Sequence, residues 1–142
     1  MEVDEVTRLF SVAEVNELIP RLELIMERLQ VRAVELRESL ASLAEETGRP
    51  ASELEVAHLV RRWPDKKDLI EDLQNLVAQI DRCGGQFKGV DLGLVDFPAE
   101  IEGEVALLCW QYGEKEVRHW HPLDGGFTGR RPLAVGRESY LQ

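Results

Sequence analysis

Apolar residues follow a helical spacing over the first third of the chain. They recur mostly three or four positions apart, which places them on one side of an α-helix: Val15, Leu18, Leu22, Ile25, Leu29, Leu36, Leu40 and Leu43. Ser11 and Glu14 have the spacing of a capping box at a helix start. The Gly–Pro segment 47–50 is typical of a helix end. The pattern therefore predicts a long helix over residues 11–46.

This predicted helix contains a proline and is longer than a compact domain of this size. Pro20 lacks an amide donor, so we expect a kink or a short break near Asn16. At 1.5 Å per residue the helix would be about 54 Å long, whereas a compact domain of this size is only about 35–40 Å across. A second helix predicted over 65–82 is about half as long, and residues 51–63 can form a further helical segment. We therefore expect a helical hairpin whose uncovered part packs on another chain, most simply in a two-fold homodimer.

After residue 85 the apolar spacing changes to a period of two, which indicates strands. We expect strands over 90–97, ended by Pro98, over 105–112 and over 116–121. Short turns between successive strands favour an antiparallel meander with one face on the helices. The predicted fold class is α+β, with a long kinked N-terminal helix in a helical hairpin packed on a small three-stranded antiparallel β-meander.

Length and charge limit the classes of function. The 142 residues fit one domain over 1–142, with a helical part over about 11–83, a sheet and Gly/Arg loop over about 86–135 and a tail over 136–142. A net charge of −10 opposes binding to nucleic acids or anionic lipids. Apolar runs are too short for a membrane span or a secretory leader. With two widely separated cysteines expected as reduced thiols, the sequence favours a cytoplasmic protein.

The candidate chemistry centres on His119 and His121, two of the three histidines. Side chains two positions apart on a strand point the same way, so this pair can chelate a transition metal, with Asp124 as a third ligand. Asp96 can serve as a ligand or general base, and Glu100 is a weaker candidate ligand. We thus expect one divalent transition metal (Zn, Mn or Fe). The alternative is that the histidines only hydrogen-bond Asp96 and Asp124 and hold the loop.

A glycine-rich segment, 125–129, precedes Arg130 and Arg131. Successive glycines allow backbone amides to converge on an anion, and arginine adds bidentate recognition, so a small anionic ligand is one interpretation. The alternative is a turn that lays Phe127 on the core and lets the arginines pair with acidic helices. Whether Cys109 or Trp110 shares the face of the histidines depends on the strand register, and only in the first case does the thiol become a candidate ligand or nucleophile.

Several segments together resemble a bacterial family of uncharacterised conserved proteins. They are the FSxxEVNxLIP segment of 10–20, the GVDLGLVDFP segment of 89–98, the dipeptides at 109–110 and 113–114, and the WH…GFxGRxPL segment of 120–133. The family is catalogued as a domain of unknown function, so the resemblance implies no activity, substrate or catalytic residue.

Two functions follow from these features. The first is an oligomeric helical interaction or assembly protein that carries a His/Asp metal or ligand site at the end of its sheet. The alternative is a metal-dependent small-molecule hydrolase or isomerase using His119, His121, Asp124 and Asp96, with Arg130 orienting an anionic substrate. Bound metal in the purified protein distinguishes the two.

Overall fold

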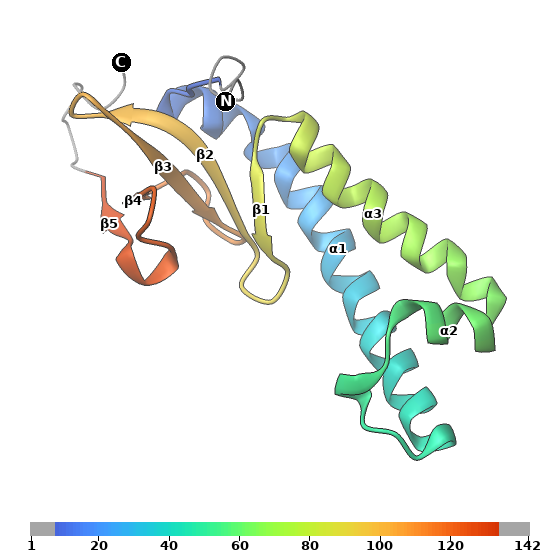
Figure 1. Cartoon of the computed structure of the whole chain (residues 1–142). Coiled ribbons are helices and arrows are strands. Elements are labelled where there is room, and N and C mark those ends of the chain that lie inside the picture. Colours follow the sequence, from blue (N-terminus) through green and yellow to red (C-terminus); the bar gives the residue numbers. More distant parts are fainter. Residues whose placement is uncertain (1–7, 134–142) are drawn as a thin grey trace.

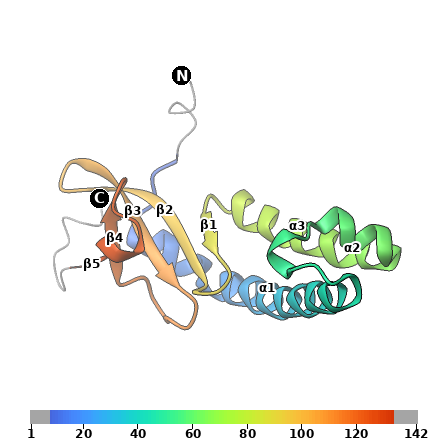
Figure 2. The same cartoon turned by 60° about the horizontal axis from the view of Figure 1, so that its bottom comes forward.

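The computed structural model describes residues 8–133 and consists of a long helical arm joined to a sheet (Figure 1). The predicted tail 136–142 lies outside the described residues. The helical elements are α1 (Val12–Thr47), η2 (Ala51–Glu53), α2 (Val56–Arg62), η3 (Pro64–Lys66) and α3 (Lys67–Arg82). Helices α1 and α3 lie side by side, and the sheet packs at the N-terminal end of α1 (Figures 1 and 2). The fold is α+β.

Helix α1 begins and ends at the predicted signals. The Ser11 hydroxyl accepts a hydrogen bond from the Glu14 amide at 3.1 Å, and the Glu14 carboxylate accepts one from the Ser11 amide at 2.9 Å, so the capping box is confirmed. Gly48 ends the helix in the left-handed conformation, with φ of 76°. The helix assignment is continuous through Pro20, so the alternative of a short break is wrong.

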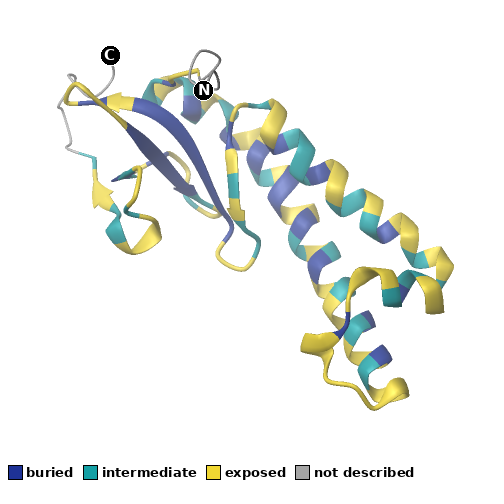
Figure 3. Cartoon of the chain, viewed as in Figure 1, coloured by how far each residue is buried: buried dark blue, intermediate teal, exposed yellow. Residues whose placement is uncertain are grey.

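The C-terminal end of α1 is covered by segments of the same chain. Leu43 packs with Leu54 and Leu59 in a second small core, and Trp63 lies against it. The short elements between α1 and α3 therefore cover the part of α1 that the sequence assigned to another chain. Figure 3 shows buried positions along α1 from the sheet to this far end. Within residues 8–133 no helix combines the length and apolar character that crossing a bilayer requires.

Within residues 8–133 the sheet has five antiparallel strands in sequential order rather than the predicted three. They are β1 (Gln86–Gly89), β2 (Leu94–Ile101), β3 (Glu104–Gln111), β4 (His119–Pro122) and β5 (Arg131–Pro132). The strand predicted over 90–97 is present with shifted bounds, because residues 90–93 form the turn between β1 and β2 and β2 covers 94–101. Gly93 has φ of 67° in this turn, and a Cβ atom there would lie 2.7 Å from Cβ of Tyr112. Only glycine fits this position without strain.

Pro98 lies within β2 and does not end it. Its carbonyl accepts a hydrogen bond from the Phe10 amide at 2.7 Å, on the side of β2 away from β3. The nitrogen and carbonyl of one residue in an antiparallel strand face the same side. The missing N–H of Pro98 therefore costs no hydrogen bond to β3, and the strand continues to Ile101.

The two faces of the sheet have different partners. Val95, Phe97, Leu108 and Trp110 belong to the main core together with residues of α1. The register pairs Asp96 with Cys109, and Cys109 with His119, so these side chains occupy the opposite face. This register answers the question left open by the sequence: Cys109 shares the face of the histidines, and Trp110 is in the core.

Candidate metal centre

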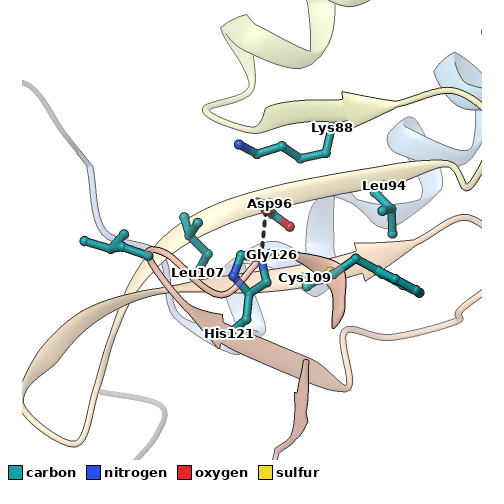
Figure 4. A pocket seen from close by; sticks show the side chains of 9 residues that line it. Lys88, Leu94, Asp96, Leu107, Cys109, His121 and Gly126 are labelled. Atoms are coloured by element: carbon teal, nitrogen blue, oxygen red, sulfur yellow. Dashed lines mark hydrogen bonds and ion pairs between the residues drawn. The ribbon is translucent and has the colours of Figure 1, made fainter. Parts of the chain in front are cut away.

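Three adjacent strands bring Asp96, Cys109 and His121 together on the outer face of the sheet. Each residue offers one potential ligand atom, and these atoms all lie within 4.8 Å of one another. The residues are almost fully buried, with exposed fractions of 3%, 1% and 2%. Figure 4 shows the carboxylate of Asp96 and the ring of His121 pointing toward each other from β2 and β4. We call these three residues the DCH cluster.

The hydrogen bonds of His121 define which ring nitrogen faces the cluster. Its Nδ1 lies 2.8 Å from the carbonyl oxygen of Pro122, and its Nε2 lies 2.9 Å from Oδ2 of Asp96. Because a carbonyl only accepts hydrogen bonds, Nδ1 carries a proton and donates it. The Nε2 atom and the carboxylate are both acceptors unless one of them is protonated, so their contact contains one further proton. A metal ion can take the place of that proton.

The remaining oxygen of Asp96 has no hydrogen-bond partner among the described residues. Its Oδ1 atom is buried, although buried carboxylate oxygens are normally paired. Leaving such an acceptor unsatisfied costs about 1–3 kcal/mol or more. The cluster therefore contains an acceptor that a cation would satisfy.

Cys109 is a protonated thiol at neutral pH. Burial raises its pKa to about 12, and the negative charge of Asp96 acts in the same direction, while the charge of Arg130 opposes it. Both ring nitrogens of His121 are already hydrogen-bonded to other groups, so the ring does not serve as a base for this thiol. The arrangement is therefore not that of a thiol nucleophile activated by histidine.

A cavity of about 250 Å³ adjoins the DCH cluster. Apart from the cluster itself, its lining consists of four large apolar side chains, one glycine and one lysine: Leu94, Leu107, Leu123, Phe127, Gly126 and Lys88. The walls come from β1, β2 and β3 and from the glycine-rich segment that follows β4. The cluster thus forms the polar part of an otherwise largely apolar pocket.

The structure separates the other predicted ligands from this cluster. His119 shares the face of His121, but its Nδ1 accepts a hydrogen bond from Arg130 at 2.9 Å and lies 3.5 Å from the carboxylate of Glu114. Asp124 is exposed in the turn after β4. Glu100 is exposed on β2, four residues and about 13 Å along the strand from Asp96. Of the predicted metal ligands and the candidate general base, the structure brings together His121 and Asp96.

The side chains of Arg130 and Arg131 contact other side chains of the same chain. The Arg130 side chain is 13% exposed and forms an ion pair of 3.0 Å with Glu114. Its guanidinium also lies 5.0 Å from the centre of the Phe127 ring. Arg131 lies 5.0 Å from the ring of Trp120. The charge of Arg130 is therefore compensated by Glu114, and this side chain anchors the glycine-rich segment to the sheet.

Sequence reasoning made Cys109 a candidate ligand or nucleophile only if the strand register placed it on the face of the histidines. The signal that identifies it is the pairing of β3 with both neighbours, which aligns Asp96, Cys109 and His119 across three strands. A shift of either register by one residue would place Trp110 there instead.

Comparisons with known proteins place the chain in a family without assigning it an activity. Neither the curated proteins nor the solved structures contain a match. The family model described as "Uncharacterized conserved protein (DUF2203)" matches residues 8–133. This match spans nearly the whole chain, including every residue of the DCH cluster, and the protein belongs to this uncharacterised conserved family.

Proposed function

We propose that the protein binds one divalent metal ion, preferably zinc, through the DCH cluster and uses it to act on a small molecule. The observation that carries the proposal is that three buried residues each place a ligand atom within 4.8 Å of the others, while Oδ1 of Asp96 has no hydrogen-bond partner among the described residues. Thiolate and imidazole ligands favour zinc, whereas manganese prefers sites composed of oxygen ligands. Among zinc, manganese and iron, the presence of Cys109 therefore favours zinc.

The spacing and orientation of the ligands suit such an ion. Tetrahedral zinc with bonds of about 2.0–2.3 Å holds its ligands roughly 3.3–3.7 Å apart. The ligand atoms of the cluster lie within 4.8 Å, so a small contraction suffices. The Nδ1–H of His121 donates to Pro122 and holds the ring with Nε2 toward the cluster, which is the usual support for a metal-binding histidine.

Three protein ligands and an adjoining cavity are typical of a catalytic site. Zinc with an open position lowers the pKa of a bound water to about 7 and supplies a nucleophile for hydrolysis. The protein's own contribution is to hold the three ligands and to surround the open position with apolar walls. Hydrolysis of a small molecule is therefore the reaction class that we propose, with isomerisation as the alternative.

Elemental analysis of protein purified without an affinity tag or chelator tests the metal. We expect about one zinc per chain, retained in His119→Ala and lost in Cys109→Ala and His121→Ala. His119→Ala is the matched control, because this histidine lies on the same strand and face but outside the DCH cluster. Circular dichroism checks that every variant is folded. Metal that is absent from the parent protein and does not bind when added, or that is lost equally in His119→Ala, contradicts the proposal.

Assembly through the helical arm is a second proposal. Leu24 and Val31 are 66% and 62% exposed and lie seven residues apart on one side of α1. This spacing favours a contact with a second copy of α1. We propose a two-fold homodimer, and sedimentation at micromolar concentration tests it. A parent protein that sediments as a monomer, with no change in Leu24→Lys, contradicts the proposal.

A further inference from the structure

We infer that the cavity beside the DCH cluster binds a small organic monoanion, namely a carboxylate on a short apolar body, between Lys88 and the open position of the metal. This inference rests on the proposed metal site and adds the class of ligand. It assigns the binding of the anion to Lys88, whereas the sequence suggested Arg130.

Charge accounting supports a ligand with one negative charge. A divalent ion bound by the thiolate of Cys109 and the carboxylate of Asp96 has no net charge together with these ligands. Lys88 is the single cationic side chain in the described lining of the cavity, and it makes no ion pair with the described residues. Arg130 does not line the cavity and is paired with Glu114. The pocket therefore offers one uncompensated positive charge.

The backbone of β1 gives Lys88 its position. Phe87 pairs with Val95 and Gly89 pairs with Leu94, so the register shifts between Phe87 and Gly89 and leaves Lys88 in a bulge. Bulges of this kind redirect a side chain and are common beside functional sites. Figure 4 shows the Lys88 side chain extended along β1 on the side of the pocket where Asp96 lies.

The remaining walls require an apolar body on the ligand. Leu94 and Leu107 are buried in the sheet, while Leu123 and Phe127 at the glycine-rich segment are 63% and 38% exposed. A ligand seated between these pairs would remove apolar surface from water. A cavity of about 250 Å³ is smaller than a typical pocket for a drug-sized ligand. The cavity equals the volume of only about eight liquid waters at roughly 30 Å³ each, so the fitting ligand is a small molecule.

Cobalt in place of zinc gives a readout independent of activity, because its visible spectrum responds to a change of ligand. The protein is loaded with Co²⁺ and titrated with 3-methylbutanoate, with the neutral 3-methylbutanamide and with inorganic phosphate. We expect 3-methylbutanoate to change the spectrum saturably and the other two compounds to have little effect. Lys88→Met should lower the affinity for 3-methylbutanoate roughly tenfold to hundredfold, as expected for loss of a hydrogen bond to a charged group.

Lys67→Met is the matched control, because Lys67 lies on α3, outside the lining of the cavity. This variant should bind 3-methylbutanoate like the parent protein. A cobalt spectrum that 3-methylbutanoate does not change overturns the inference and leaves the metal site intact. Equal binding of the amide, tighter binding of phosphate or an unchanged affinity in Lys88→Met also overturns it. Failure to bind cobalt at all overturns both proposals, so the two failures are distinguishable.

Discussion

The burial of Cys109 predicts a specific loss of stability at alkaline pH in the metal-free protein. Its pKa is about 12 in the folded chain against an ordinary value of 9.0, which we take for the unfolded chain. Between these two values the unfolded chain releases the thiol proton while the folded chain keeps it. The stabilisation is thus fully present below pH 9 and is lost as the pH rises toward 12. From pH 8 to pH 11, two units at about 1.4 kcal/mol each give a loss of about 3 kcal/mol.

Urea denaturation in the presence of a chelator measures this effect. Lysines and tyrosines also titrate in this range, so the quantity of interest is the difference between the parent protein and Cys109→Ala at each pH. We expect this difference to fall by about 3 kcal/mol from pH 8 to pH 11. A difference for Cys109→Ala that stays constant from pH 8 to pH 11 would show that this thiol titrates normally, and would refute the account of its environment.

Three further predictions concern the cluster and the turn that supports it. His121→Ala should lower the free energy of unfolding by about 3–5 kcal/mol, because Asp96 is left buried without a partner, and Asp96→Ala in the same chain should recover part of this loss in urea denaturation. Zinc binding should release about two protons, one from the thiol and one from the contact between Asp96 and His121, and calorimetry in buffers of different ionisation enthalpy counts them; release of none would contradict the ligand set. Gly93→Ala should cost about 1–3 kcal/mol in thermal or urea unfolding, because of its positive φ and close neighbour, whereas Gly129→Ala, with open space around it, should be nearly neutral.

The helices could be predicted because their signals are local. The capping box of Ser11 and Glu14 and the glycine at 48 depend on a few neighbouring residues, and apolar spacing repeats over many turns. The sequence left open a kink or a short break at Pro20, and the helix assignment continues through this residue, so the break is excluded. The cover over the far end of α1 depends on Leu54 and Leu59, whose distant contacts no local pattern reveals.

The strands at the two edges escaped prediction for a different reason. Strand β1 has four residues and a bulge, and β5 has two residues. Neither is long enough to show a period of two. Strand β5 forms because the glycine-rich segment folds back and pairs Arg131 with Trp120. Pro98 was misread as a strand end because its free side faces Phe10 and not another strand of the sheet, and this is a tertiary feature.

The outer face of the sheet carries two clusters of polar side chains, and each contains one of the two histidines of β4. His119 and His121 therefore have different partners. On one side, Glu114 neutralises Arg130 and both contact His119, which ties the glycine-rich segment to β3 and β4. On the other side, His121 contacts Asp96 and leaves one carboxylate oxygen unsatisfied. In the first group Glu114 balances the charge of Arg130, although the buried Nε of Arg130 has no hydrogen-bond partner among the described residues. This group holds the glycine-rich segment that carries Phe127.

For the second group we propose a bound cation, and the contacts of the two histidines differ in a way that sequence spacing does not reveal. Both histidines lie on the same face of β4, and both lie near carboxylates. Only His121 has its other nitrogen fixed by a backbone carbonyl and a thiol among its neighbours. The deciding property is whether the surrounding protein already balances each charge, and strand register determines that balance by choosing which residues of β2 and β3 stand opposite each ring.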